Sequence, residues 1–490
     1  MSLSSIHNAW NKFLGTTGVL PWVVIGGVNL GLALGIGRGT LRNFPNSGDE
    51  YAMQLSARLF SQGRLSAPPL EPREFFTPYQ VINDHRLYGK YPPGWPALLS
   101  GGMKLGVPWL VNPLLGLLTL IILHRTARDH YTIETANLSL FLVAGNPYFL
   151  FNSASYFSHP CCLFALTLFT FCSLRATGSP GRWSDFVGAG TAAGLALVTR
   201  PFTAAVVVST IIGLLLLKAG KGSRRRMDWK KCFLGVGVFC LFGVALLAYN
   251  RALTGDPLLS PFAKYNPRDT LGENEGTNDW TWAVHNNLLL RLWSLNEWMP
   301  LSLVVCAAFL WKRECRDNPN TLILVGVPLS LLIGHLFYLR DPMNEYGPRY
   351  LYESTSALLL LSAVAIRSTG HAGPVLAAAI LVINLTTLAT KNARFSKEVE
   401  DRMAVFEAVE QRNLSNAIVL LNTGSGTMLP RDLLRNGTDL TGTVLYALDL
   451  GDNNAKLKKR YPERRYYLFT QLQPTGETRL VPEDTSPIGK

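Results

Sequence analysis

The chain has 490 residues, of which 48% are hydrophobic and only 16% are charged. Soluble domains carry about 25% charged residues, and here long apolar runs alternate with short charged loops, which excludes an ordinary soluble globular protein. The net charge of +13 would suit a nucleic-acid-binding protein. Much of the excess, however, lies in short loops such as 218–231, where positive residues orient membrane helices. We therefore expect a lipid bilayer, and no nucleic acid, as the partner of these charges.

About eleven apolar windows are long enough to cross a bilayer, which predicts an α-helical polytopic membrane protein. The first window is followed by a charged loop instead of a small-residue cleavage site, so we interpret it as a spanning helix and not as a cleaved signal. The windows lie near 17–36, 105–123, 133–150, 157–174, 186–199, 201–217, 232–249, 299–311, 321–339, 351–366 and 373–390.

Basic residues fall in alternate loops, and this sets the expected orientation. With eleven spans, the basic loops share one side of the membrane, and the positive-inside rule makes that side cytoplasmic. The segments 37–93, 250–298, 340–350 and everything after about 391 then face outward. The expected location is the inner (plasma) membrane. The basic loops are 124–128, 175–182, 218–231, 312–316 and the position of Arg367.

The chain divides into two expected domains, a membrane domain over 1–390 and an extracytoplasmic α/β domain over 391–490. The outer loop 37–93 has apolar residues at helical spacing, which suits short helices in the membrane interface. The tail starts with a helix-like stretch, followed by three strand-like runs at Ala417–Leu421, Val444–Leu448 and Tyr466–Phe469. Helix-like segments between those runs predict a small α/β domain.

An adjacent acidic pair, Asp49 and Glu50, follows the first spanning window. A carboxylate at the membrane surface can take the proton of an acceptor hydroxyl while that oxygen attacks a sugar carbon, so both are candidate catalytic residues. The alternative interpretation is a helix start, because acidic residues favour the positive end of the helix dipole. The pair by itself does not decide between these interpretations.

Three cationic residues are expected at the same side of the membrane. Lys90 precedes Tyr91-Pro92-Pro93, Arg349 lies in the run Asn344 to Tyr350, and Arg200 stands between two spans. Positive charge at the interface suits a lipid-phosphate leaving group, and Arg binds phosphate oxygens with a two-pronged geometry. The alternatives are interfacial anchoring and snorkelling to the headgroups.

Residues beside these cations are candidates for contacting the substrate. They are Tyr91, His159, Glu345, Tyr346 and Tyr350, although a lone histidine near a helix end, such as His159 or His335, is commonly a packing residue. Glu273, Glu275, Asp279, Trp280 and Trp282 of the loop 250–298 could face a sugar or a divalent ion, or be a solvated loop.

The chain lacks several motifs of other enzyme classes. It has no phosphate-cradling glycine loop, no Ser/His/Asp signature and no Cys/His metal spacing. The cytoplasmic loops are too short for a nucleotide-binding domain. The seven cysteines lie in apolar runs or at their ends, which argues against a disulfide framework.

Asp49-Glu50 after the first span, the Lys90-Tyr91-Pro92-Pro93 segment and the late Arg349-Tyr350 pair resemble class C glycosyltransferases. The branch of protein O-mannosyltransferases and aminoarabinose transferases is the most similar one, over roughly 17–390. The resemblance implies a sugar donor linked to a polyprenyl phosphate, used on the outer face with inversion. It also implies acceptor activation by Asp49, with Glu50 as the neighbour in the motif, and phosphate contacts from Lys90 and Arg349.

The resemblance leaves several points open. Some members of the class use a divalent metal ion and others do not, so no cofactor is assigned with certainty. The acceptor could be a glycolipid, a polysaccharide or a protein. The rival functions are a transporter or flippase of lipid-linked sugars, which predicts charged residues along a path through the membrane, and a non-catalytic scaffold. The absence of an internal repeat weakly disfavours transporters built from inverted repeats.

Overall fold

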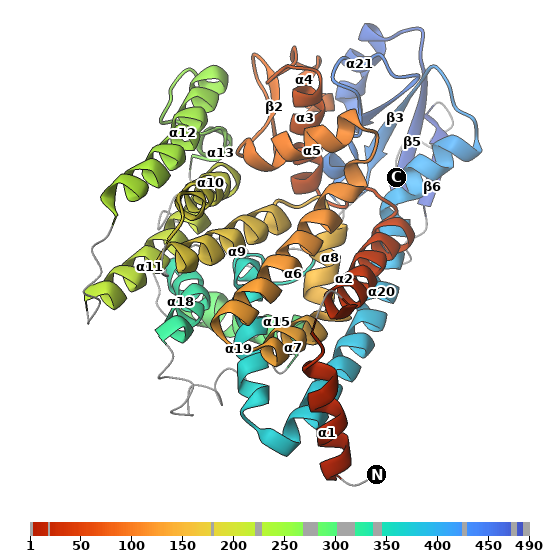
Figure 1. Cartoon of the computed structure of the whole chain (residues 1–490). Helices are drawn as coiled ribbons and strands as arrows, with labels where there is room; N and C mark the ends of the chain where they lie inside the picture. The colour runs from red at the N-terminus through yellow and green to blue at the C-terminus, as the bar shows by residue number, and fades with distance from the viewer. Residues whose placement is uncertain are drawn as a thin grey trace.

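A computed structural model describes residues 3–17, 20–177, 181–220, 228–267, 283–300, 319–336, 345–423, 429–471 and 478–483. The chain forms a helical bundle with a small sheet domain at one end (Figure 1). The same end carries the helices of the first long loop, which are α3 (Gly48–Ser61), α4 (Arg73–Phe76) and α5 (Gly94–Lys104). The amino-terminal helix α1 (Leu3–Leu14) lies at the opposite end.

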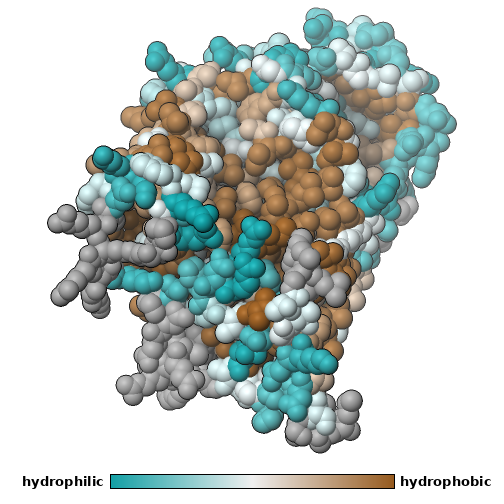
Figure 2. Space-filling view, viewed as in Figure 1, coloured by the Kyte–Doolittle hydropathy of each residue, from teal (hydrophilic) through white to brown (hydrophobic). Residues whose placement is uncertain are grey.

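The bundle has the features of a membrane domain. Among the described residues, six helices are long and apolar enough to cross a bilayer. Hydrophobic residues form a broad patch across the middle of the face shown in Figure 2. Side chains such as Phe233 and Leu241 of α12 are about 70% exposed (71% and 68%). The six are α2 (Leu20–Gly35, continued by the π-turn Ile36–Thr40), α6 (Val111–His130), α9 (His159–Ala176), α11 (Pro201–Gly220), α12 (Trp229–Thr254) and α20 (Gly373–Gln411).

Shorter helices occupy most of the other predicted spans. They are α7 (Ile133–Val143), α10 (Trp183–Thr199), α18 (Pro319–Gly334) and α19 (Thr355–Arg367). The predicted span 299–311 and the end of 321–339 lie almost entirely outside the described residues. The polytopic helical fold is therefore confirmed, and the count of eleven spans stays a prediction.

The predicted span 133–150 is wrong as a single helix. Helix α7 ends at Val143, and a separate helix α8 runs over Pro147–Ala154. Between them, Gly145 has a positive φ of 68°, and Asn146 caps α8 by accepting a hydrogen bond from the main-chain N–H of Phe149 at 3.0 Å. Glycine after a helix and proline at the first helical position are the usual stop and start signals. The sequence Gly145-Asn146-Pro147 therefore indicates the break between the two helices.

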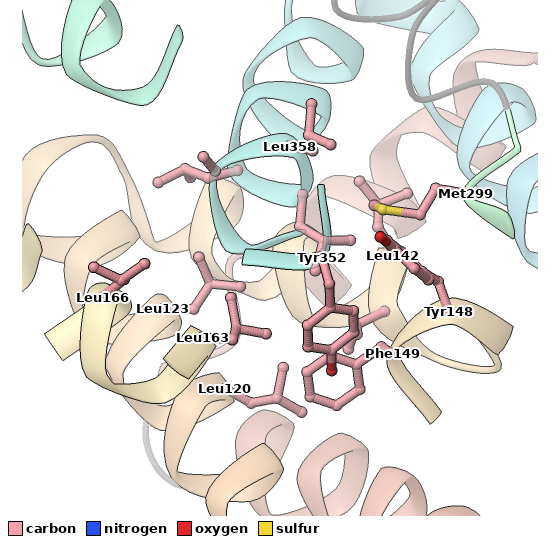
Figure 3. Close-up of a cluster of buried hydrophobic side chains, with 14 of the residues drawn as sticks. Leu120, Leu123, Leu142, Tyr148, Phe149, Leu163, Leu166, Met299, Tyr352 and Leu358 are labelled. Carbon is pink, nitrogen blue, oxygen red and sulfur yellow. The ribbon is translucent and has the colours of Figure 1, made fainter. Parts of the chain in front are cut away.

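The core of the bundle comes from helices far apart in the sequence. Leu120 and Leu123 of α6 meet Leu163 and Leu166 of α9, and Tyr352 projects among them from a later segment (Figure 3). These side chains are at most 2% exposed. Burying an aliphatic side chain is worth roughly 1.5–3 kcal/mol in water, whereas within a bilayer the gain comes mainly from close packing.

Polar contacts join the predicted basic loops at one end of the bundle. Arg175 lies 3.1 Å from Asp185 and 3.7 Å from Asp129. Lys231 Nζ donates to the carbonyl of Gly181 at 2.9 Å, and Arg367 lies 3.9 Å from Glu134. The described parts of four basic loops therefore share one side, as the alternation of charge predicts, whereas the loop 312–316 lies outside the described residues. The assignment of that side to the cytoplasm stays a prediction.

The long helix α20 connects the membrane domain to the tail. Its 39 residues extend for about 58 Å at 1.5 Å per residue, roughly twice the hydrocarbon thickness of a bilayer. The predicted boundary at 390/391 falls inside this helix, and the helix-like start of the tail is its continuation. The carboxyl-terminal half of α20 carries the sheet domain.

The sheet domain contains the three predicted strands and one further strand. The strand order is β4-β3-β5-β6, with β3 parallel to both neighbours and β6 antiparallel to β5. Helix α21 (Asn454–Arg460) connects β4 to β5. The strands are β3 (Ala417–Asn422), β4 (Val444–Leu448), β5 (Arg465–Gln471) and β6 (Thr478–Pro482).

Alternate residues of β3 bury opposite faces of this sheet. Val419 and Leu421 pack with Val405 and Val409 of α20. Ile418 and Leu420 pack in a second cluster with apolar residues of α3 and α4 in the long outer loop. Because side chains alternate across a strand, one apolar strand fixes the domain to both the membrane helix and the outer loop.

Candidate active site

The candidate acids lie in the first turn of α3, and they point in different directions. Ser47 caps the helix, since its Oγ accepts a hydrogen bond from the N–H of Glu50 at 3.2 Å. Glu50 is fully buried, and its two carboxylate oxygens accept main-chain N–H groups of Tyr156 and Asn46, each at 2.8 Å. Burial, followed by the charge of Glu345, raises the pKa of Glu50 to about 8. Asp49 instead faces a cavity.

The carboxylate of Asp49 has a donor on each oxygen. The Tyr91 hydroxyl donates to Oδ1 at 2.5 Å, and Arg349 Nη1 lies 3.5 Å from Oδ2. Burial, and then the charge of Asp49, raises the pKa of Tyr91 well above its usual value, so the phenol remains a donor. Asp49 and Arg349 are each about one fifth exposed (17% and 22%), which leaves the carboxylate accessible from the cavity.

Lys90 reaches the same cavity through a group of aromatic rings. Its Nζ lies 4.5 Å from the ring centre of Phe262, 4.8 Å from that of Tyr265 and 5.3 Å from that of Tyr91. The side chain is 5% exposed, and the ring faces stabilise an ammonium ion that has left bulk water. Phe262 and Tyr265 belong to α13 (Pro261–Tyr265), in the loop after α12.

Arg200 is held by a buried carboxylate. Its Nε lies 3.1 Å from Glu353 Oε1, and the same oxygen lies 3.3 Å from His159 Nδ1. Arg200 Nη1 is also 3.4 Å from His159 Nε2. Arg200 separates α10 from α11, and Glu353 lies in a 3-10 turn (Tyr352–Ser354) before α19. Arg200 and His159 both line the cavity, with the acid behind them.

The segment that contains Arg349 has three further candidates, and they lie in different surroundings. Glu345 lines the cavity, and burial raises its pKa to about 7. Tyr350 also lines it and stacks on His335 with ring centres 4.7 Å apart. Tyr346 does not line the cavity: it is 1% exposed and stacks on Phe151 in the core.

These side chains converge on one cavity of about 790 Å³, a size typical of ligand sites. Eight of the ten predicted site residues line it, and the exceptions are Glu50 and Tyr346. Asp432, from the sheet domain, is an unpredicted acidic member. The apolar part of the lining includes Met53, Phe157, Phe202, Leu246 and Phe262.

No metal site is evident in the described part of the chain, where no three His, Cys, Asp or Glu side chains gather closely enough to hold an ion. The acids and tryptophans of 273–282 that were candidates for a sugar or metal contact lie outside the described residues.

Several solved structures of membrane proteins have the same fold as this chain. An ArnT from Cupriavidus metallidurans, bound to undecaprenyl phosphate, is 14% identical, with a TM-score of 0.56 over 92% of this chain and 93% of that one. The chain has the class C glycosyltransferase fold. An oligosaccharyltransferase of Archaeoglobus fulgidus, in complex with zinc and sulfate, is 12% identical, with a TM-score of 0.54 over 92% of this chain and 68% of that one.

A further solved structure of this fold contains a lipid phosphate. The archaeal oligosaccharyltransferase AglB from Archaeoglobus fulgidus, in complex with an inhibitory peptide and a dolichol-phosphate, is 11% identical, with a TM-score of 0.50 over 96% of this chain and 75% of that one.

Family models match two parts of the chain. Residues 90–249 match the family described as dolichyl-phosphate-mannose-protein mannosyltransferase. Residues 417–483 match a domain of unknown function. No curated protein matches the sequence. The family match over residues 90–249 and the shared fold both agree with the resemblance noted in the sequence.

The sequence analysis missed two acidic residues of the site. Glu353 lies inside the predicted span 351–366, and an ionisable residue within a span is a functional candidate by default, so a signal was present. Asp432 lies on a 3-10 turn (Pro430–Leu433) of the tail, and nothing in its local sequence indicates that it packs beside Asp49, which lies almost 400 residues earlier in the chain.

Proposed function

We propose that the protein moves a sugar from a polyprenyl-phosphate donor to a hydroxyl of a glycan, glycolipid or protein acceptor. The reaction takes place at the extracytoplasmic face of the inner membrane, with Asp49 as general base. One observation carries the proposal: Asp49 and the cations Lys90, Arg200 and Arg349 line one cavity at the loop end of the bundle. Undecaprenyl phosphate in the ArnT structure and dolichol-phosphate in the AglB structure support a lipid phosphate as the donor group.

The carboxylate and the cations of the cavity suit a reaction in which the acceptor oxygen displaces the polyprenyl phosphate in one step. The acceptor oxygen loses its proton to the Asp49 carboxylate and forms a bond to the anomeric carbon of the donor. The bond from that carbon to the phosphate oxygen breaks, and its electron pair stays on the polyprenyl phosphate. Attack opposite the leaving group inverts the anomeric centre.

The cations stabilise the phosphate charge that develops as this bond breaks. Arg349 contacts Asp49 as well, so it orients the base and the leaving group together. The Tyr91 hydroxyl holds the other carboxylate oxygen. Glu50 has the role of a positioning residue, because both its oxygens bind main-chain N–H groups and neither faces the substrate.

The proposal is tested with the purified full chain in lipid nanodiscs. The donor probe is a panel of tritiated undecaprenyl-phosphate hexoses, and the acceptor probe is a membrane extract of cells lacking the gene. We expect label to appear in the extract and undecaprenyl phosphate to accumulate in equal amount. If the labelled donor crosses the membrane of liposomes and no label is transferred, the result would support a flippase function and would refute the proposed glycosyltransferase activity.

A further inference from the structure

Among the described residues, the sheet domain reaches the cavity through the turn Pro430–Leu433, which we call the docking turn. Asp432 of this turn lines the cavity. The N–H of Tyr79 donates to the carbonyl of Arg431 at 3.3 Å, which joins the turn to the outer loop. Arg435 donates to the carbonyl of Pro45 at 2.7 Å and lies 4.3 Å from the ring centre of Tyr51. The docking turn is thus joined to Tyr79, and Arg435, two residues after the turn, contacts Pro45 and Tyr51 on either side of Asp49.

The first residue of α3 makes room for the Asp432 carboxylate. A Cβ atom added at Gly48 would lie 2.5 Å from Asp432 Oδ1, a distance at which one of the two must move. Asp432 therefore lies directly against the residue before Asp49. Within the described residues, its Oδ1 is buried and has no hydrogen-bond partner, so a ligand hydroxyl at this position would satisfy an acceptor atom that is otherwise unpaired.

Three acidic side chains line the cavity near one another. The carboxyl groups of Asp432 and Glu345 accompany Asp49, and the charge of Asp49 contributes to raising the pKa of both, after burial. Arg402 and Arg435 oppose this effect on Asp432 from the protein side. A phosphate is repelled by carboxylates and attracted by the cations, so the donor phosphate belongs with the cations and the acceptor with the acids.

We propose that Asp432 is a specificity-determining residue that binds a hydroxyl-rich acceptor, and that the tail domain therefore supplies one wall of the acceptor site. This inference rests on the proposed function. A sugar ring presents neighbouring hydroxyls that can donate to Asp49, Asp432 and Glu345 together. The single hydroxyl of a serine or threonine side chain would satisfy Asp49 alone and would leave the other acids unused. The acceptor is accordingly a glycan or the glycan part of a glycolipid.

The test compares Asp432→Asn with Asp452→Asn, a matched control on an exposed turn of the same domain. The acceptor probe is the membrane extract of cells lacking the gene, added as a dilution series, with a tritiated undecaprenyl-phosphate hexose as donor. We expect the half-saturating amount of extract to rise about 10-fold for Asp432→Asn, the effect of losing a hydrogen bond to a charged group. Binding of undecaprenyl phosphate should stay within about twofold, and the control should match the wild type.

Three outcomes separate this inference from the proposed function. If the wild type transfers no label to any acceptor, the proposed function fails. If transfer requires Asp49 but Asp432→Asn leaves the half-saturating amount unchanged, the inference alone fails. It also fails if a serine- and threonine-containing peptide accepts label as well as the extract does. Should Asp432→Asn not bind undecaprenyl phosphate, the smaller Asp432→Ser provides the same comparison.

Discussion

Replacing Asp49 by Asn should move two measurable quantities in opposite directions. Asn keeps the shape of the side chain and an oxygen that can accept the Tyr91 hydroxyl, but it cannot take a proton from the acceptor. Removing a general base costs about 10²- to 10⁴-fold in rate, so we expect sugar transfer to fall by that factor.

Donor binding should instead become tighter in this variant. Asp49 Oδ2 lies 3.5 Å from Arg349 Nη1, so a phosphate bound to the far side of the same guanidinium would be about 6 Å from the carboxylate. At an effective dielectric constant of about 40, two like charges at that separation repel by about 1.4 kcal/mol. Undecaprenyl phosphate should therefore bind up to about 10-fold more tightly to Asp49→Asn than to the wild type.

Both quantities are measured on the same nanodisc preparation, by label transfer and by titration with undecaprenyl phosphate. Asp452→Asn is the matched control and should change neither. If Asp49→Asn lost binding and transfer together, the carboxylate would have a structural role. If it transferred sugar at the normal rate, the assignment of the base would be refuted.

Other variants test the remaining parts of the site. Lys90→Ala should weaken undecaprenyl phosphate binding by about 10-fold or more, because a charge-assisted contact is lost. Lys104→Ala, at an exposed position, should leave this binding unchanged. Equal effects of the two substitutions would contradict a phosphate contact from Lys90. Glu353→Gln leaves its arginine partner without a buried counter-charge and should cost about 3–5 kcal/mol of stability in thermal unfolding. The control Glu410→Gln, at an exposed position of α20, should cost less than about 0.5 kcal/mol. The pKa of folded Glu50, about 8 against the usual 4.5, means that its contribution to stability is full below about pH 4.5 and is lost as the pH rises through 8. The melting temperature should therefore fall from pH 5 to 8.5, and the fall should be shallower in Glu50→Gln; identical slopes would show that the carboxyl does not titrate in this range.

The acidic pair shows how far a motif can be interpreted without a structure. Both interpretations of Asp49-Glu50 were available from the sequence, the chemical one and the helix start. In the structure the pair begins α3, so the second interpretation holds for both residues. Successive helical residues point about 100° apart, which buries Glu50 against main-chain donors and turns Asp49 into the cavity. Only the packing around the helix could distinguish the two neighbours.

The apolar periodicity, the alternation of basic loops and the three β-rich runs determined by themselves that this chain is a helical membrane protein with a small sheet domain. These properties are local, because a bilayer requires long apolar helices whatever surrounds them. The tertiary structure alone decided that Asp432 packs against Gly48 beside Asp49, that Glu353 holds Arg200, and that Tyr346 is a core residue. Each of these depends on which faces of distant segments pack together, and a carboxylate carries no sequence signal of the partner that it will meet in space.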